Sequence, residues 1–207
     1  MSKKCLIISG GEFHPISVPE SDVFIIACDR GYDYAVRCGI TPDLVVSDFD
    51  SGSLSVAEEI PVERFRSEKD DTDTMIAIRY ACDHGFDEAK IVCALGGRLD
   101  HLLANLQSAV FAQKRGLQVR ISCPDTEICT LMNGQIALPR KDGWSLSVFA
   151  ANDCCRGICI HGAKYELSNV ELTNAFPLGV SNEWACEEVS VCVKEGILLI
   201  VESKLQT

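Results

Sequence analysis

The sequence predicts two parts, an N-terminal Rossmann-like α/β domain in residues 1–124 and a C-terminal antiparallel β-sandwich domain in residues 125–207. Up to residue 123, short and almost unbroken apolar runs alternate with amphipathic stretches. That pattern is typical of a parallel sheet covered by helices on both faces. From residue 126 onward, extended runs follow one another without a helical repeat, which predicts an antiparallel sandwich or a partial barrel.

In the first part, we expect strands at residues 5–9, 23–28, 44–47, 90–94 and 119–123, and helices at residues 32–38, 72–84 and 101–115. Gly39, Gly85 and Gly116 each follow a predicted helix, where a left-handed cap is favoured. In parallel sheets of this kind, ligands bind beyond the carboxyl ends of the strands. The polar clusters at those ends are therefore the candidates for a functional site.

In the second part, we expect strands at residues 127–132, 135–138, 145–150, 157–161, 189–194 and 197–202. Asn133-Gly134 lies between the first two strands and is a strong signal for a two-residue hairpin turn. Glu195-Gly196 lies between the last two strands and predicts a second hairpin.

Composition excludes several functional classes. A hydrophobic content of 47% with 24% charged residues is that of a soluble globular protein, and no apolar run approaches the roughly 20 residues that span a bilayer. Without an export signal we expect a cytoplasmic protein, no membrane partner, and twelve reduced, mostly buried cysteines. The net charge of -11 argues against a nucleic-acid partner, which would demand clustered Lys and Arg.

The apolar run at residues 44–47 ends in Asp48 and Asp50, which would share one face of an extended strand. Two adjacent carboxylates repel each other unless a cation lies between them, and hard oxygen ligands at this spacing suit Mg²⁺. The pattern is short and common, so a strand that runs out into a polar turn at residues 51–53 is the alternative.

Two further clusters follow predicted strands. Gly10 and Gly11 would let the backbone approach a phosphate or an adenine closely, or they would make only a tight turn. Asp29, which precedes Arg30, would either cap the following helix or face the ligand crevice, and spacing alone favours the cap.

The segment Lys69-Asp70-Asp71-Thr72-Asp73 opens the predicted helix at residues 72–84. Asp71 or Thr72 would be its N-cap, but three aspartates in four residues exceed what capping needs. We therefore expect Asp73 to complete a metal site with the aspartate pair and Lys69 to neutralise phosphate oxygens.

The segment Gly96-Gly97-Arg98-Leu99-Asp100-His101 follows another predicted strand. Arg98 offers a planar donor fork suited to phosphate. His101 begins a helix, whose positive end disfavours the charged imidazole, so we expect a hydrogen-bonding role and no proton transfer.

Taken together, these segments resemble the thiamine pyrophosphokinase (thiamine diphosphokinase) family. The resemblance is carried in the family's order by residues 47–51 (SDFDS), 69–73 (KDDTD), 96–101 (GGRLDH) and 179–183 (GVSNE). It implies an ATP-binding domain followed by a thiamine-binding β-sandwich, in a homodimer with sites at the subunit interface. The implied reaction is transfer of the pyrophosphoryl group from ATP to the thiamine hydroxyl, with release of AMP.

The resemblance also implies roles for individual residues. Mg²⁺ would be held by Asp48, Asp50 and Asp73. ATP would be bound by Gly10, Gly11, Asp29, Arg30, Lys69, Asp70, Thr72, Arg98, Asp100 and His101. Thiamine would lie against Ser181 and Asn182, with Trp184 stacked on its rings.

Two questions remain open from the residues. Arg30 and Ser47 stand where the family commonly has glycine, which leaves the contacts around Asp29 undefined. Asp73 and Asp100 are both candidates for the group that accepts the hydroxyl proton.

Three rival functions fit the residues less well. A haloacid-dehalogenase-type phosphatase also uses a strand-end D-x-D, but it requires Thr or Val two residues later, where this chain has Gly52. A metal-dependent glycosyltransferase would leave the other motifs unused. A non-catalytic nucleotide or thiamine sensor would not need the complete set of carboxylates.

Overall fold

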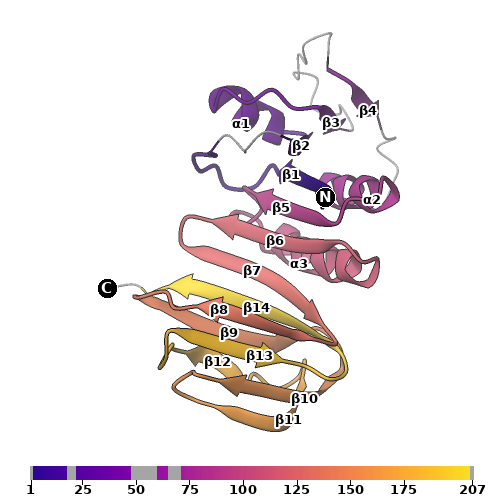
Figure 1. Cartoon of the computed structure of the whole chain (residues 1–207). Coiled ribbons are helices and arrows are strands. Elements are labelled where there is room, and N and C mark those ends of the chain that lie inside the picture. The colour runs from indigo at the N-terminus through magenta and orange to yellow at the C-terminus, as the bar shows by residue number, and fades with distance from the viewer. Residues whose placement is uncertain (1, 18–21, 48–59, 65–70, 206–207) are drawn as a thin grey trace. The chain divides into compact units, whose positions relative to one another are not determined.

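A computed structural model describes residues 2–17, 22–47, 60–64 and 71–205. The chain forms two compact units, Met1–Pro124 and Asp125–Thr207 (Figure 1). None of the described helices combines the length and the apolar character that crossing a membrane requires.

The N-terminal unit contains a parallel sheet with strand order β6-β5-β1-β2-β3-β4. The strands are β1 (Lys4–Ile8), β2 (Phe24–Cys28), β3 (Leu44–Ser47), β4 (Val62–Arg64), β5 (Glu88–Val92) and β6 (Gln118–Cys123). The sheet starts in its interior, because β1 pairs with β2 on one side and β5 on the other. The predicted α/β architecture is confirmed, although the short strand β4 was not expected.

Among the described residues, three helices accompany this sheet: α1 (Gly31–Arg37), α2 (Asp73–Asp83) and α3 (Leu99–Lys114). Helices α2 and α3 pack side by side (Figure 1). Gly39, Gly85 and Gly116 follow the helices with φ of 69°, 68° and 86°, so the predicted left-handed caps are confirmed. The strands are buried along most of their length, as parallel strands covered on both faces must be.

The C-terminal unit is an antiparallel sandwich, as predicted. One sheet has the order β12-β9-β14-β7 and the other β11-β10-β13-β8. The strands are β7 (Thr126–Met132), β8 (Gln135–Pro139), β9 (Trp144–Ala150), β10 (Cys154–His161), β11 (Leu167–Thr173), β12 (Gly179–Asn182), β13 (Glu188–Cys192) and β14 (Ile197–Lys204). Inward-facing side chains of both sheets form one core, which includes Leu146, Ile158, Val191 and Ile200. Strands β11 and β12 were not predicted, because their residues are largely exposed and lack an apolar alternation.

Both predicted hairpins in this unit are wrong. Strand β7 pairs with β14 and β8 pairs with β13, so each two-residue turn carries the chain from one sheet to the other. The two turns bond to each other: Asn133 N–H donates to the Gly196 carbonyl (3.2 Å), and Gly196 N–H donates to Asn133 Oδ1 (2.9 Å). The left-handed turn residue is present, with φ of 47° at Asn133. The same turn chemistry therefore serves a corner between sheets, which local sequence does not distinguish from a hairpin.

All twelve cysteines are free thiols, as expected, but fewer than predicted are fully buried. Five are buried, six are partly buried and Cys186 is exposed. Burial raises the pKa of the Cys5 thiol to about 12, which keeps it protonated at neutral pH.

Candidate functional site

A cavity of about 810 Å³ lies in the N-terminal unit, beyond the carboxyl ends of β1, β2 and β5 and at the start of α2. Its volume is in the range of roughly 300–1,000 Å³ that is usual for small-molecule sites. Strand order explains its place, because β1 continues to β2 on one side and pairs with the distant β5 on the other. Eight of the predicted ATP and metal residues line this cavity: Gly10, Gly11, Asp29, Arg30, Thr72, Asp73, Arg98 and His101.

The glycine pair after β1 makes a tight turn and also forms one wall of the cavity. Gly11 N–H donates to the Cys93 carbonyl (2.8 Å), and a Cβ on Gly11 would lie only 2.6 Å from that oxygen. Tyr34 Oη donates to the Gly11 carbonyl (2.9 Å). The absence of side chains at this turn leaves its backbone open to the cavity.

Asp29 faces the cavity, and the prediction that it caps the next helix is wrong. Helix α1 begins after Arg30 without a side-chain cap. Asp29 takes φ of 45°, and its Oδ1 accepts a bond from Ser47 Oγ (3.5 Å). Ser47, which replaces the glycine common in the family, therefore helps to orient Asp29. The helix starts close to β1, since a Cβ on Gly31 would lie 2.0 Å from the Ile8 carbonyl.

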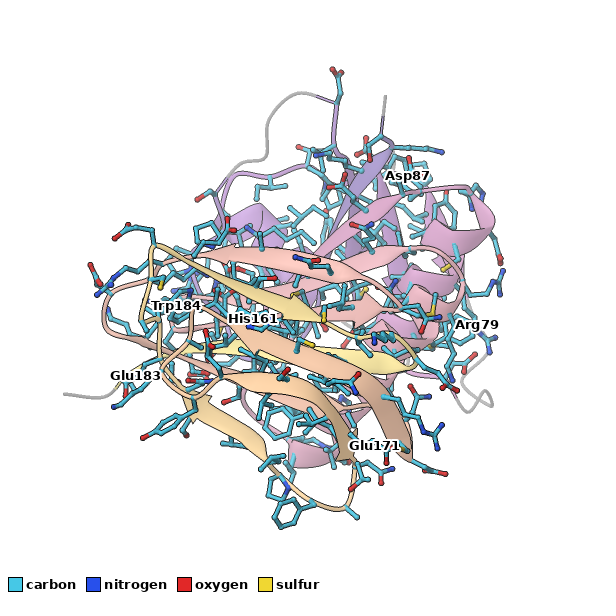
Figure 2. All side chains as sticks on the ribbon, turned by 60° about the horizontal axis from the view of Figure 1, so that its bottom comes forward. Arg79, Asp87, His161, Glu171, Glu183 and Trp184 are labelled. Carbon is cyan, nitrogen blue, oxygen red and sulfur yellow. The ribbon has the colours of Figure 1, made fainter. Side chains whose placement is uncertain are left out.

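The start of α2 brings a further carboxylate to the cavity. Thr72 is the N-cap, as predicted, and its Oγ1 accepts a bond from Met75 N–H (3.2 Å). Asp71 forms an ion pair with Arg79 (2.9 Å; Arg79 is labelled in Figure 2). Thr74 Oγ1 lies 2.7 Å from Ser9 Oγ, which fixes the helix start against the end of β1. The positive end of the helix dipole therefore lies at the cavity, where an anion is favoured.

Cys28 lines the cavity within electrostatic reach of two of its carboxylates. Burial raises the pKa of this thiol well above its ordinary value, and the negative charges of Asp73 and Asp29 raise it further. Cys28 Sγ also donates to the Asp73 carbonyl (3.6 Å). The thiol is therefore held neutral between two carboxylates at the floor of the cavity.

Arg98 and Asp100 form a bidentate pair at the start of α3. Arg98 Nη2 lies 2.5 Å from Asp100 Oδ2 and Arg98 Nε lies 3.1 Å from Asp100 Oδ1. This hydrogen bonding lowers the pKa of Asp100 to about 2. Arg98 lines the cavity but Asp100 does not, so Asp100 acts on the site through Arg98. His101 also lines the cavity, and its backbone N–H donates to Asp100 Oδ1 (3.0 Å).

The cavity residues that were missed from the sequence include Glu12, Phe13 and Tyr34. The Glu12 carboxylate lies against Gly96, where an added Cβ would come within 2.3 Å of its Oε2. The rings of Phe13 and Tyr34 lie 5.1 Å apart and tilted, and the Arg37 guanidinium covers Phe13 at 4.1 Å. Their position directly after the glycine pair is the signal that could have identified Glu12 and Phe13 as cavity residues. These side chains add an apolar wall to a cavity that is otherwise polar.

Four predicted residues, Asp48, Asp50, Lys69 and Asp70, lie outside the described residues. Within the described ranges, no three His, Cys, Asp or Glu side chains are grouped so as to hold a metal ion. The Mg²⁺ set of Asp48, Asp50 and Asp73 therefore stays a prediction.

The three residues predicted to contact thiamine lie in the C-terminal unit. Ser181 is exposed with φ of 59°. Asn182 is buried, accepts bonds from Tyr165 N–H (2.9 Å) and Glu183 N–H (3.0 Å), and donates to the Tyr165 carbonyl (2.7 Å). Trp184 is buried beside Glu183 (Figure 2), and its indole N–H donates to the Leu138 carbonyl (3.0 Å). These contacts give Asn182 and Trp184 structural roles, while their contact with thiamine stays a prediction.

The sequence matches two family models, "Thiamin pyrophosphokinase, catalytic domain" over residues 17–121 and "Thiamin pyrophosphokinase, vitamin B1 binding domain" over residues 135–198. The thiamine pyrophosphokinase of Bacillus subtilis (strain 168) is 26% identical over 186 residues, which cover 86% of each chain.

Solved structures give the same match for the fold. A thiamine pyrophosphokinase structure from Bacillus subtilis superposes with a TM-score of 0.87 at 24% identity, covering 99% of this chain and 100% of that one. A thiamin pyrophosphokinase family protein from Enterococcus faecalis gives 0.81 at 25% identity, with 98% and 100% covered. The thiamin pyrophosphokinase of Candida albicans gives 0.74 at 15% identity, with 98% and 90% covered.

Proposed function

This chain belongs to the thiamin pyrophosphokinase family and has the thiamine diphosphokinase activity of that family; we propose that its N-terminal cavity binds ATP for the reaction. The pyrophosphoryl group would pass from ATP to the thiamine hydroxyl, giving thiamine diphosphate and AMP. The observation that carries the proposal is the composition of the cavity wall. A glycine turn, a helix start, Arg98 and the carboxylates of Asp29 and Asp73 line one cavity at the carboxyl edge of one parallel sheet.

The cavity offers what a triphosphate needs. The start of α2 favours negative charge, and Arg98 presents a planar fork that can donate two bonds to phosphate oxygens. Phe13 and Tyr34 supply aromatic faces of the kind on which a nucleobase packs. Arg30 adds a second positive side chain at the rim.

Catalysis would rest on positioning and on electrostatic stabilisation. Phosphoryl-type transfer needs little covalent chemistry from the protein, so aligned donors contribute most of the rate enhancement. Arg98, with Lys69 from the segment outside the described residues, would stabilise the transferred group and the departing AMP. Asp100 would keep the Arg98 fork in one orientation through its two bonds.

A divalent cation fits the donor chemistry of the cavity. Asp29 and Asp73 provide carboxylate oxygens in one cavity, and Mg²⁺ typically takes one or two carboxylates together with substrate phosphates. Asp73, with Asp48 and Asp50, would hold the ion. When bound, Mg²⁺ would offset the negative charge of the phosphate oxygens.

Of the two candidate proton acceptors, Asp100 is the weaker. Its two bonds from Arg98 lower its pKa to about 2, and a carboxylate with so low a pKa is a poor base at neutral pH. We therefore assign Asp100 a positioning role and leave the proton acceptor to a group within the cavity.

The C-terminal unit would supply the thiamine contacts. The family resemblance points to Ser181 and Asn182, and thiamine's positive thiazolium ring suits a chain with a net charge of -11. We further propose that the enzyme is a cytoplasmic homodimer, as the resemblance implies.

The test is a product analysis with ATP, Mg²⁺ and thiamine. The expected result is thiamine diphosphate and AMP in equal amounts, with neither product when thiamine or Mg²⁺ is omitted. Release of inorganic phosphate would instead indicate a phosphatase, and binding of both ligands without any product would indicate a sensor.

A further inference from the structure

Two cysteines face each other on the outer side of the sheet β11-β10-β13-β8. Cys159 on β10 and Cys192 on β13 are direct partners in the antiparallel register. Both are partly exposed, whereas Ile158 and Ile160, which flank Cys159, are fully buried in the core. Alternate residues of a strand share a face, so Cys159 lies on the same face as the exposed His161 (Figure 2). The pair is therefore open to solvent-borne reagents.

The strand geometry already suits a bond between the two sulfurs. Directly opposed residues of antiparallel strands have Cα atoms about 4.5–5.5 Å apart. Disulfides need Cα atoms at roughly 4.4–6.8 Å, so the backbone would not have to move. Cys154 and Cys155 offer no such pair, because consecutive residues point to opposite faces and Cys155 is fully buried.

A β-bulge gives the Cys159 sulfur a hydrogen-bond donor. Ile158 pairs with Val170 and Ile160 with Leu167, so two residues of β11 stand opposite Cys159 alone. One of them, Asn169, takes φ of 51° and donates its backbone N–H to Cys159 Sγ (3.3 Å).

A positive charge lies behind this donor. Lys194 Nζ lies 3.3 Å from Asn169 Oδ1. The Asn169 N–H would keep its acceptor when Cys159 reacts as the thiolate, which is the nucleophilic form of a cysteine.

Lys194 also acts on Cys192, where its charge favours the thiolate, but partial burial and Cys159 outweigh it. Cys192 Sγ donates to the Gly157 carbonyl (3.8 Å), a bond that requires the protonated thiol. Partial burial and the neighbouring Cys159 raise the pKa of the Cys192 thiol. Within this pair, Cys159 Sγ accepts a hydrogen bond, whereas Cys192 Sγ donates one and must lose that proton before it can attack.

We propose that Cys159 and Cys192 form a redox-active dithiol that reacts with low-molecular-weight disulfides. Cys159 thiolate attacks one sulfur of the disulfide, whose S–S bond breaks, and one thiolate leaves. Cys192 then loses its proton and attacks the Cys159 sulfur, which releases the second thiolate and forms the Cys159–Cys192 bond. The protein loses two protons and two electrons, and the small disulfide is reduced to two thiols.

The cross-link would close a loop that contains β11, β12 and the segment of Ser181 and Asn182. It would thus tie together both ends of the stretch predicted to contact thiamine. The inference itself does not depend on the proposed function, because it rests on the two strands and the bulge alone.

The test uses the full chain in glutathione buffers of graded ratio, followed by alkylation, trypsin digestion and mass spectrometry. Glutathione disulfide should join the peptide of residues 157–164 to that of residues 165–194, with the loss of two hydrogen atoms, and reduced glutathione should reverse it. Because the longer peptide also contains Cys186, the Cys186→Ser variant is the matched control and should keep the cross-link.

Two single variants separate the steps. In Cys192→Ser, reaction should stop at a mixed disulfide of Cys159 with glutathione. In Cys159→Ser, Cys192 should react with glutathione disulfide at least tenfold more slowly than Cys159 reacts in the wild-type protein. The proposal is overturned if both peptides of the wild-type protein remain separately alkylated while exposed Cys186 becomes glutathionylated, or if Cys186→Ser abolishes the cross-link. The first of these two outcomes is measured on the wild-type protein and does not depend on the folding of any variant.

Discussion

The two units of this protein place similar polar residues in similar backbone conformations and use them differently. Asp29 in the N-terminal unit and Ser181 in the C-terminal unit both take a left-handed φ, of 45° and 59°. Asp29 has one long contact, 3.5 Å from Ser47, and faces the cavity. Asn182, next to Ser181, makes three bonds of 2.7–3.0 Å to backbone groups. At these positions, the first unit leaves the Asp29 side chain available to a ligand, whereas the second uses the Asn182 side chain to bond its own backbone.

Strand direction explains the difference. In a parallel sheet, all carboxyl ends meet at one edge, so loops far apart in sequence contribute side chains to the same cavity. In an antiparallel sandwich, neighbouring strands end at opposite edges, and an irregular segment must satisfy its backbone locally. A change at the cavity should therefore affect turnover, and a change at Asn182 should affect stability first.

The largest expected effect is that of Asp73→Asn on turnover. Asn keeps the size of the side chain and its place in the first helical turn, but it removes the charge at the proposed metal site. We expect kcat to fall about 100-fold or more, since misplacing the reacting group by a fraction of a bond length already costs that much. The free energy of unfolding, measured by urea denaturation, should stay within about 0.5 kcal/mol of wild type. Near-normal release of AMP at saturating Mg²⁺ would remove Asp73 from the metal site.

The matching change in the other unit is Asn182→Ala. It leaves the Tyr165 and Glu183 amides without their side-chain acceptor in a partly buried setting. The free energy of unfolding should fall by about 1–3 kcal/mol. Ser181→Ala, at the exposed neighbouring position, should change it by no more than about 0.5 kcal/mol. If both variants unfold like wild type in urea while thiamine KM rises, Asn182 belongs to the ligand and the contrast between the units fails.

Sequence reasoning reached the fold because its signals were repeated along the chain. The parallel strands were found from their apolar runs, and helix ends were found from Gly39, Gly85 and Gly116. It failed at the two turns of the sandwich, where Asn133-Gly134 and Glu195-Gly196 have hairpin chemistry but connect different sheets. The pairing of β7 with β14 is determined by long-range packing in the core, and the sequence of a two-residue turn does not indicate it.

The site was predictable where a residue's role follows from its place at a strand end. Arg98 lines the cavity for that reason, and Thr72 and Asp73 line it because they begin helix α2. Asp29 was misread because a residue that precedes a helix is more often a cap, and the bond from Ser47 depends on the adjacency of β2 and β3. Glu12 was missed because its position depends on contact with a loop more than eighty residues away, at Gly96.

That contact gives a matched pair of glycine variants. Gly96 and Gly97 have φ of 79° and 70°, so an added methyl group strains both alike, by about 1–2 kcal/mol. At Gly96 the methyl group would displace the Glu12 carboxylate, whereas at Gly97 no heavy atom of the residues that the structure describes lies within 4 Å of the added Cβ. We expect Gly96→Ala to raise KM for ATP about fivefold to tenfold more than Gly97→Ala, measured by AMP release. Equal effects on KM would mean that Glu12 has no part in shaping the nucleotide cavity.

The smallest expected effect is that of Asp100→Asn, which tests whether a residue outside the cavity acts only through Arg98. The Arg98 bonds lower the pKa of Asp100 from 3.8 to about 2, so the charged pair is complete above the ordinary pKa and is lost only as the pH falls through about 2. Asn offers Arg98 one neutral acceptor oxygen in place of the two oxygens of the carboxylate, so the guanidinium should be less firmly oriented. We expect KM for ATP to rise about twofold to fivefold, with kcat nearly unchanged.

The pH dependence separates this positioning role from proton transfer. Because Asp100 is ionised throughout the range from about pH 5 to pH 9, the profiles of kcat against pH for wild type and Asp100→Asn should run parallel. A base would behave differently, since its removal would lower kcat by about 100-fold or more and abolish the acidic limb of the profile. Loss of that limb in Asp100→Asn would make Asp100 the proton acceptor and would place a working carboxylate outside the parallel-sheet cavity.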